Sequence, residues 1–225
     1  MNNRRDILKY AAFGGAALAI PTPIWATEGA DDYLRFVHPE LREGAAQILA
    51  MHANEQPISD EGLPAFREGM KQWEQPWRTD VPAEKRTIKG AAGNPDVDIY
   101  IINADPANPR PAILHTHGGG YIGGSAKMFV SNLQTICDEL GCMAVSVEYR
   151  LAPETTYAGS IEDNYAGLKW LYDNAEAIGA DKTRIAVMGE SAGGGHAALL
   201  AITARNRGEV PVAFQCLTYP MLDDR

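Results

Sequence analysis

The spacing of apolar residues changes along the chain and separates a helical segment from a region of alternating strands and helices. From about residue 31 to residue 77, apolar positions recur at steps typical of a helix: Leu41, Ala45, Ile48 and Met51. This part contains no strand-like run and closes at Trp73 and Trp77. We therefore expect residues 27–80 to form an N-terminal helical cap segment that lies over the main domain.

Residues 81–225, the predicted main domain, begin with the alternation of a β-hairpin. The strand pattern starts near Arg86, and apolar positions alternate over residues 97–102 after a turn signal at Gly93, Asn94 and Pro95. Such alternation predicts an antiparallel pair of strands with one partly exposed face.

Four short apolar runs follow, at residues 112–115, 143–147, 185–188 and 212–217. Amphipathic helical patterns separate them. The first predicted helix has an apolar face of Phe129, Leu133, Ile136 and Leu140 and stops at Gly141; the second starts in a capping box of Ser160 and Asp163 and ends at Gly179; the third runs from about Ser191 to Gly208. Nearly continuous apolar strands joined by helices predict the α/β class, with a mostly parallel sheet of about six strands and helices on both faces.

Composition and charge are those of a globular protein that is not built to bind polyanions. Of the 225 residues, 45% are hydrophobic and 22% charged, which is enough for one sizeable core. The formal net charge is −9 and no basic stripe interrupts it. A nucleic acid would be repelled, so we expect no nucleic-acid partner.

Residues 1–26 have the pattern of an export signal of the twin-arginine type. Arg4 and Arg5 precede an apolar stretch from Tyr10 to about Ile20, and Ala26 supplies a small residue at a plausible cleavage point. The apolar stretch is short for a bilayer, so cleavage is favoured over the alternative of a membrane anchor. We therefore expect a periplasmic or secreted protein without a stable membrane span.

The three cysteines, Cys137, Cys142 and Cys216, cannot pair completely because their number is odd. Cys137 and Cys142 flank a predicted helix end and could in principle join in an oxidising compartment. The simpler interpretation is that all three are small buried hydrophobes. Their spacing is not that of a metal site.

A glycine-flanked serine lies where the strand at residues 185–188 meets the third helix, in Gly189-Glu190-Ser191-Ala192-Gly193. A strand that turns sharply into a helix exposes the serine hydroxyl at the sheet edge, and the glycines let strand and helix approach each other. The helix N-terminus also favours developing negative charge. The pattern predicts that Ser191 is a nucleophile; the alternative is a serine that only caps the helix.

A glycine run, His117-Gly118-Gly119-Gly120, follows the strand at residues 112–115. Ester cleavage passes through a tetrahedral oxyanion, which unobstructed amide N–H groups stabilise. We assign this oxyanion hole to Gly119 and Gly120, with Gly118 and Ala192 as further donors. The alternative is a dinucleotide- or phosphate-binding loop, but Gly123-Gly124-Ser125 prolongs the loop instead of opening a helix, and no P-loop lysine follows.

Three blocks occur in a fixed order: His117 to Gly120, then Tyr149-Arg150-Leu151-Ala152-Pro153-Glu154, then Gly189-Glu190-Ser191-Ala192-Gly193-Gly194. Together they resemble the signature of the hormone-sensitive-lipase-like (bacterial type IV) esterases of the α/β-hydrolase superfamily, and the resemblance covers about residues 30–225. It implies an α/β-hydrolase fold of eight mostly parallel strands with an N-terminal helical cap. It also implies hydrolysis of small short-acyl esters without a metal or cofactor.

The resemblance further implies supporting roles for four residues of these blocks: His117, Arg150, Glu154 and Glu190. Arg150 and Glu154 are expected to organise buried polar contacts behind the nucleophile. The alternative for both is an ordinary surface ion pair, which contributes little to stability.

The catalytic base is where the sequence departs from the family, whose triad runs in the order serine, acid, histidine. After Ser191 the one histidine is His196, which five helical steps place about 140° around the helix. We read it as a packing or surface residue, and His115 as structural. Asp223 and Asp224 follow the last strand too soon to match the family's acid.

We therefore expect the chain to be truncated after about six strands, before the acid and the base, and to be a poor esterase by itself. One alternative is a catalytically impaired binding protein of this fold. Another is a carbohydrate or aryl acyl esterase that uses the same site.

Overall fold

The computed structural model describes residues 34–52, 58–91 and 93–223. Two compact units divide the chain, one within Ala17–Phe66 and one that includes Arg67–Arg225. The predicted export signal, residues 1–26, lies outside the described residues. Within the described ranges, no helix combines the length and the apolar character that crossing a bilayer requires.

The smaller unit is helical, as its apolar spacing predicts. It contains the 3-10 turn η3 (Pro39–Leu41), α3 (Arg42–His52) and the start of α4 (Leu63–Met70), which continues into the larger unit. The 3-10 turn η4 (Lys71–Trp73) follows α4. The role of this segment as a cap stays a prediction.

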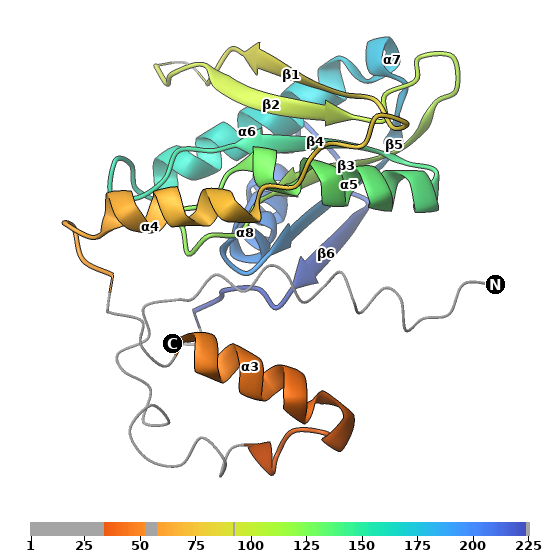
Figure 1. The fold of residues 1–225 in the computed structure, drawn as a ribbon. Coiled ribbons are helices and arrows are strands. Elements are labelled where there is room, and N and C mark those ends of the chain that lie inside the picture. Colours follow the sequence, from red (N-terminus) through yellow and green to blue (C-terminus); the bar gives the residue numbers. More distant parts are fainter. Residues whose placement is uncertain (1–33, 53–57, 92, 224–225) are drawn as a thin grey trace. The chain divides into compact units, whose positions relative to one another are not determined.

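The larger unit is built on a six-stranded sheet (Figure 1), with strands in the order β1-β2-β4-β3-β5-β6. Antiparallel pairing joins β1 to β2 and β2 to β4, and the other neighbours are parallel. This confirms the predicted hairpin followed by a parallel sheet. The strands are β1 (Ala83–Ile88), β2 (Val97–Ile102), β3 (Arg110–Thr116), β4 (Met143–Glu148), β5 (Ala180–Glu190) and β6 (Phe214–Thr218).

Helices cover both faces of this sheet. On one face, α5 packs against β2 and β4; on the other, α6 and α8 pack against the central strands. The helices are α5 (Ala126–Leu140), α6 (Tyr157–Asp173), the short α7 (Ala175–Ile178) and α8 (Ala192–Arg207). Gly141, Gly179 and Gly208 end α5, α7 and α8 in the left-handed conformation, as helix-stopping glycines commonly do.

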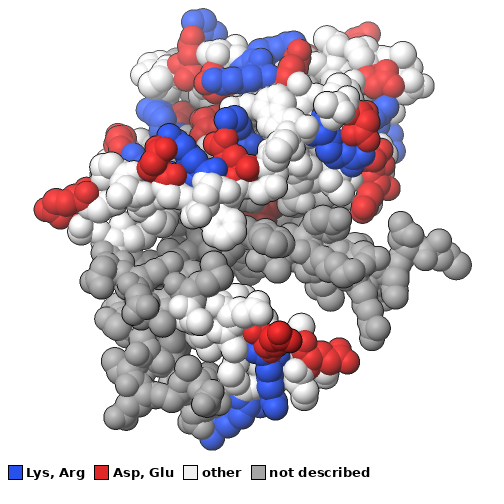
Figure 2. Space-filling model, viewed as in Figure 1, with Lys and Arg blue, Asp and Glu red and all other residues white. Residues whose placement is uncertain are grey.

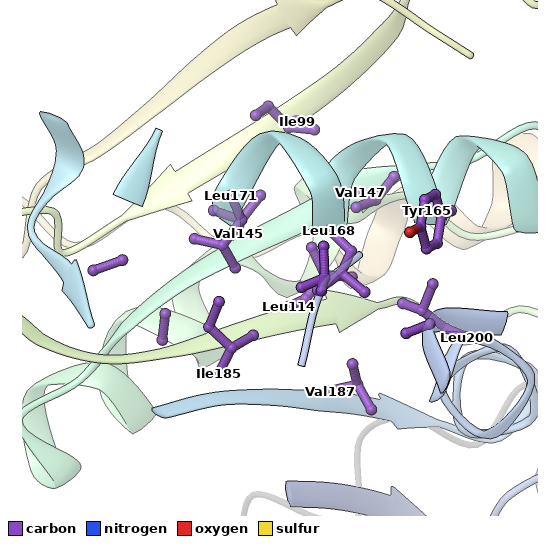
Figure 3. Close-up of a cluster of buried hydrophobic side chains, with 14 of the residues drawn as sticks. Ile99, Leu114, Val145, Val147, Tyr165, Leu168, Leu171, Ile185, Val187 and Leu200 are labelled. Atoms are coloured by element: carbon purple, nitrogen blue, oxygen red, sulfur yellow. The ribbon is translucent and has the colours of Figure 1, made fainter. Parts of the chain in front are cut away.

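The main core lies between the sheet and helices α6 and α8 (Figure 3). Leu168 of α6 and Leu200 of α8 reach toward Leu114 and Val187 of the sheet, and all four side chains are fully buried. Truncation of such a leucine to alanine typically costs about 2–5 kcal/mol. The core therefore fixes the strand ends from which the candidate site is built.

The predicted hairpin has its partly exposed face on β1, where residues 84–87 are exposed, whereas Tyr100 and Ile102 of β2 are buried beneath α5. Two expectations about side-chain exposure are wrong. Leu140 is 70% exposed, because the buried stripe of α5 ends at Cys137. Cys216 is exposed on β6, so the three cysteines are not all buried.

The predicted start of the second helix is also wrong. Helix α6 begins at Tyr157 after Thr156, so Ser160 already lies within its first turns. The Ser160 hydroxyl donates to the Thr156 carbonyl at 3.3 Å, and Asp163 binds Arg150. Ser160 and Asp163 therefore do not cap the helix but make these other contacts.

Helix α6 lies close to β4 at Gly167, and a substitution there tests the packing of this helix on the sheet. A Cβ there would lie 2.5 Å from Cγ2 of the buried Val147, and a β-branched side chain has little freedom to move. We expect Gly167→Ala to lower the free energy of unfolding by about 1–3 kcal/mol, measured by urea denaturation.

The matched control is Gly69→Ala in α4, where a Cβ would meet nothing within 4 Å. That substitution should leave stability unchanged or raise it by up to about 1 kcal/mol, because alanine favours helix. Equal effects of the two substitutions would contradict the packing at Gly167.

Candidate active site

Ser191 sits on a backbone turn between β5 and α8. Its φ is 54° and its ψ is −118°, a conformation that L-residues rarely adopt and that costs about 1–3 kcal/mol. The turn is held from outside: the Ser191 amide donates to the Thr218 carbonyl at 3.0 Å, and the Met221 amide donates to the Ser191 carbonyl at 2.8 Å. The end of β6 and the segment after it thus fix the strained turn.

The glycines beside Ser191 permit a very close approach of backbones. A Cβ on Gly193 would lie 2.0 Å from the Thr116 carbonyl oxygen, and one on Gly189 would lie 2.3 Å from the Gly193 carbonyl oxygen. Any side chain at either position would drive β3, β5 and α8 apart. The predicted reason for glycine in this motif is confirmed.

The predicted oxyanion loop lies directly against this turn. A Cβ on Gly118 would be 3.0 Å from the Glu190 carbonyl oxygen and 3.8 Å from the Ser191 Cβ. Gly119 and Gly120 have φ values of 133° and 64°, which glycine adopts without strain. The Gly123 amide donates to the Gly119 carbonyl at 2.8 Å and closes the loop.

This loop is prolonged before α5 begins, as the sequence predicts. Ser125 caps α5, accepting a hydrogen bond from the Met128 amide at 3.4 Å. The glycines therefore do not open a helix as a dinucleotide-binding fingerprint would. Among the described residues, none accepts a hydrogen bond from the Gly119, Gly120 or Ala192 amide.

His117 supports the loop from beneath. Its ring is fully buried and stacked on Tyr149, with 4.1 Å between the ring centres. Its Nδ1 donates to the Gly118 carbonyl at 2.8 Å, and the Tyr149 hydroxyl donates to the His117 carbonyl at 2.7 Å. Burial lowers the pKa of His117 to about 3, so the ring is neutral near pH 7.

His196 is a packing residue and not a surface residue, which were the two predicted alternatives. It is 2% exposed and meets the rings of Tyr121 and Tyr149 edge-on, with centres 4.8 and 4.7 Å away. Burial lowers its pKa to about 4. Within the described part of the chain, no hydrogen bond joins it to Ser191, so it is not placed as a base.

Glu190 is held by a buried histidine that sequence reasoning treated only as structural. His115 Nε2 lies 3.0 Å from Glu190 Oε2, and its Nδ1 lies 2.8 Å from Ser146 Oγ. A carboxylate oxygen accepts, so Nε2 donates to Glu190, and the Ser146 hydroxyl donates to the other ring nitrogen, Nδ1. These two hydrogen bonds fix the side chain of Glu190, the residue that precedes the nucleophile. Ser146 was missed, because only the pairing of β3 with β4 places it opposite His115.

Arg150 is partly exposed and pairs with a buried carboxylate that the family blocks do not contain. Its Nε lies 2.8 Å from Oδ2 of Asp163, whose side chain is 1% exposed. Its Nη2 also donates to the Asn94 side chain at 2.8 Å. This pair ties the turn after β4 to α6.

For Glu154 the buried role is wrong. Its side chain is 59% exposed and pairs with Arg67 at 2.7 Å. Arg67 also donates to the carbonyls of Ile122 and Ala152. It therefore links the loop before α5 to the loop after β4. The guanidinium of Arg67 lowers the pKa of Glu154 to about 2. Sequence gave no signal for this pair, whose members are 87 positions apart.

A cavity of about 300 Å³ lies beside the end of the glycine loop, with Gly124, Met70 and Met128 in its wall. The buried carboxyl of Glu148 also lines it and accepts from the Ala126 amide at 2.9 Å. Burial raises the pKa of Glu148 to about 7. Sequence reasoning missed this residue, because nothing local marks a strand-end carboxylate as a helix cap.

The charged side chains near this cavity form exposed pairs. Figure 2 shows basic and acidic groups side by side on one face. Among such pairs are Lys127 with Glu74 at 2.6 Å and Lys85 with Asp98 at 2.6 Å. In the described ranges, no group of His, Cys, Asp and Glu has an arrangement suited to a metal ion.

The burial of His196 generates a prediction about pH. Its folded pKa lies below the ordinary value of 6.5, so the unfolded chain binds an extra proton between about pH 4 and 6.5. As the pH is lowered through that window, the free energy of unfolding should therefore decrease, by up to about 3 kcal/mol from this residue. We expect His196→Phe to lack this loss, measured by urea denaturation from pH 8 to pH 4.5. A difference between wild type and variant that does not change with pH would contradict it.

Comparison with known proteins identifies the fold. Residues 113–225 match a family model described as the alpha/beta hydrolase fold. In a solved structure, a bacterial heroin esterase, the match has a TM-score of 0.75 and 37% identity, covering 86% of this chain and 61% of that one.

Characterised relatives carry esterase names. Esterase LipI of Mycobacterium tuberculosis is 36% identical over 163 residues, which is 72% of this chain and 51% of LipI. Carboxylesterase NlhH of the same species is 36% identical over 142 residues, 63% of this chain and 44% of NlhH. The chain thus spans about half the length of these relatives. With its six-stranded sheet, glycine loop and Ser191 turn, the chain belongs to the α/β-hydrolase fold family, among the hormone-sensitive-lipase-like esterases.

Proposed function

We propose that the protein hydrolyses small short-acyl carboxylic esters through an acyl-enzyme on Ser191. The observation that carries this proposal is the contact between two backbone features, the positive-φ turn of Ser191 and the glycine loop: a Cβ added at Gly118 would lie 3.8 Å from the Ser191 Cβ. The esterase names of the matched relatives support the same reaction class.

In the proposed reaction, the Ser191 oxygen attacks the ester carbonyl and its proton passes to a base. The carbonyl oxygen becomes negative in the tetrahedral intermediate and is stabilised by the amides of Gly119, Gly120 and Ala192, with Gly118 as a further donor. The alcohol leaves with a proton, and water then releases the acid from Ser191. One oxyanion donor typically contributes about 3–4 kcal/mol.

Several contacts support this assignment of the amides. Gly119 and Gly120 donate to no described residue, and their loop is fixed by His117 and Tyr149. The Ala192 amide opens α8, where the helix dipole also favours an anion. The donors are thus held in place before substrate arrives, which avoids reorganisation during the reaction.

In this proposal the general base that takes the Ser191 proton is none of the three histidines near the site. Neither His115, His117 nor His196 hydrogen-bonds to the Ser191 hydroxyl in the described part of the chain. We propose that a histidine and an acid outside the matched half, as the longer relatives would accommodate, complete the triad. Export through the signal at residues 1–26 belongs to the same proposal.

Among the residues that the structure describes, no imidazole hydrogen-bonds to the Ser191 hydroxyl, which favours a second candidate, a catalytically impaired ester-binding protein of this fold. An oxyanion hole and binding alone give only about 10³–10⁴-fold acceleration over water. Turnover of p-nitrophenyl acetate by the full-length protein separates the candidates, because an esterase exceeds that limit by orders of magnitude.

The nucleophile is tested by covalent trapping. We expect a fluorophosphonate to add once to the full-length protein and Ser191→Ala to abolish the adduct, with a labelling rate at least about 1000-fold lower. Intact-mass spectrometry measures the adduct. Ser131→Ala, on the half-buried side of α5, is the control and should label normally. Labelling that survives in Ser191→Ala would discard the assignment.

The oxyanion loop is tested by paired glycine substitutions. We expect Gly119→Ala to lower kcat by about 100–1000-fold with little change in KM, because a Cβ 2.0 Å from the Gly123 carbonyl displaces the loop. Gly93→Ala also falls at positive φ but meets nothing within 4 Å in the β1–β2 turn. It should keep the wild-type rate, and equal rates for both variants would refute the role of the loop.

A further inference from the structure

Two cysteines meet where α5 ends and β4 begins. Gly141 ends the helix in the left-handed conformation, and the Cys142 amide donates to the Cys137 carbonyl at 3.0 Å. A hydrogen bond spanning six residues around a left-handed glycine is the Schellman motif. The residues at its two ends characteristically touch through their side chains, and here both are cysteines.

The surroundings hold this geometry independently of the thiols. Both side chains are buried in the cluster beneath α5, with Cys137 at 0% and Cys142 at 4% exposed. Asn103 Nδ2 donates to the Cys142 carbonyl at 2.8 Å and to the Cys137 carbonyl at 3.4 Å. Arg110 in turn donates to the Asn103 carbonyl at 3.4 Å. The two cysteine backbones are thus clamped by β2–β3 residues.

The thiols are electrostatically unequal. A hydrogen bond between them, together with burial, raises the pKa of Cys137, and the same hydrogen bond lowers the pKa of Cys142. The Arg110 guanidinium acts on both in the lowering direction. Cys142, the less buried of the two, is therefore the better nucleophile, since the thiolate is the reactive form.

We propose that Cys137 and Cys142 form a redox site that closes into an intramolecular disulfide when the protein meets a small-molecule disulfide such as oxidised glutathione. The Cys142 thiolate attacks one glutathione sulfur and releases one glutathione thiolate. Cys137 then loses its proton, attacks the Cys142 sulfur of the mixed disulfide and releases the second. Two protein thiols are oxidised, and one glutathione disulfide is reduced to two thiolates, which take up the two protons that the cysteines lose.

The bond requires little movement of the fold. A disulfide needs sulfurs about 2.05 Å apart and backbones already close, and the six-residue hydrogen bond supplies the second condition. The link joins the end of α5 to the first residues of β4, which pairs with both β2 and β3. We expect closure to raise Tm by about 4–8 °C, because it restrains the unfolded chain over a short loop.

The site does not depend on Ser191 or on esterase activity. It would be closed in an oxidising compartment and open in a reducing one. Cys216, exposed on β6, has no part in it and serves as an internal reference.

The test uses the full chain equilibrated with reduced and oxidised glutathione, then alkylated with iodoacetamide in denaturant and digested with trypsin. Cleavage after Lys127 and Arg150 leaves both cysteines in residues 128–150 and Cys216 in residues 208–225. We expect the first peptide to resist alkylation and to be about 2 Da lighter than its reduced form, as hydrogen loss on disulfide formation requires. The second peptide should carry glutathione or a single alkyl group.

Repeating the glutathione equilibration in urea gives the equilibrium constant for disulfide formation in the unfolded chain. Comparison with the folded protein shows whether the fold favours the disulfide. We expect the equilibrium constant to be at least tenfold higher in the folded protein, and Cys142→Ser to abolish the disulfide while Cys216→Ser leaves it unchanged. Full alkylation of residues 128–150 while Cys216 carries glutathione would overturn the proposal. So would a lasting glutathione adduct on Cys137 or Cys142, or an equilibrium constant no higher than in urea.

Discussion

The close approach of three backbones around Ser191 is the constraint on which the rest of this structure depends. At Gly193 and Gly189 the neighbouring carbonyls stand so near that only a hydrogen atom fits in place of a side chain. That contact lets the end of β5 turn directly into α8 and forces Ser191 into positive φ. The hydrogen bonds from Met221 and to Thr218 keep the turn from relaxing. Strain of this kind persists only where the surroundings overdetermine it.

Burial then decides the chemistry of the histidines around the turn. His117 and His196 are enclosed by aromatic rings, and desolvation keeps both rings uncharged near pH 7. His115 differs because both of its nitrogens have partners, Glu190 and Ser146. His115 and His117 thus support the Glu190 carboxylate and the Gly118 carbonyl, while His196 packs against two tyrosine rings. The proposed esterase reaction needs a further histidine, and the matched segment covers only about half of LipI and of NlhH.

The same architecture places a second chemically distinctive pair, Cys137 and Cys142, at the other end of α5 from the glycine loop. Helix α5 begins at Ala126, after its cap Ser125 beside the loop, and ends at the cysteine turn. Side chains of Ser125 and Glu148 accept from amides at its first turn, and the Cys142 amide donates to a carbonyl of its last turn. The proposed reactions are therefore separate in space and in the groups they use.

Local patterns in the sequence were sufficient for the order of the strands and helices and for locating the Ser191 turn and the glycine loop, but not for the start of α6 or for Ser146 and Glu148. The turn at Ser191, the glycine loop and the α/β order follow from short-range periodicity and from glycines whose backbone role is local. Long-range partners could not be read in this way. The Arg67–Glu154 pair, the His115–Ser146 contact and the covered face of β2 all depend on which strands become neighbours. That choice is made by burial of the whole sheet between two layers of helices, a property of the folded chain that no short window of residues contains.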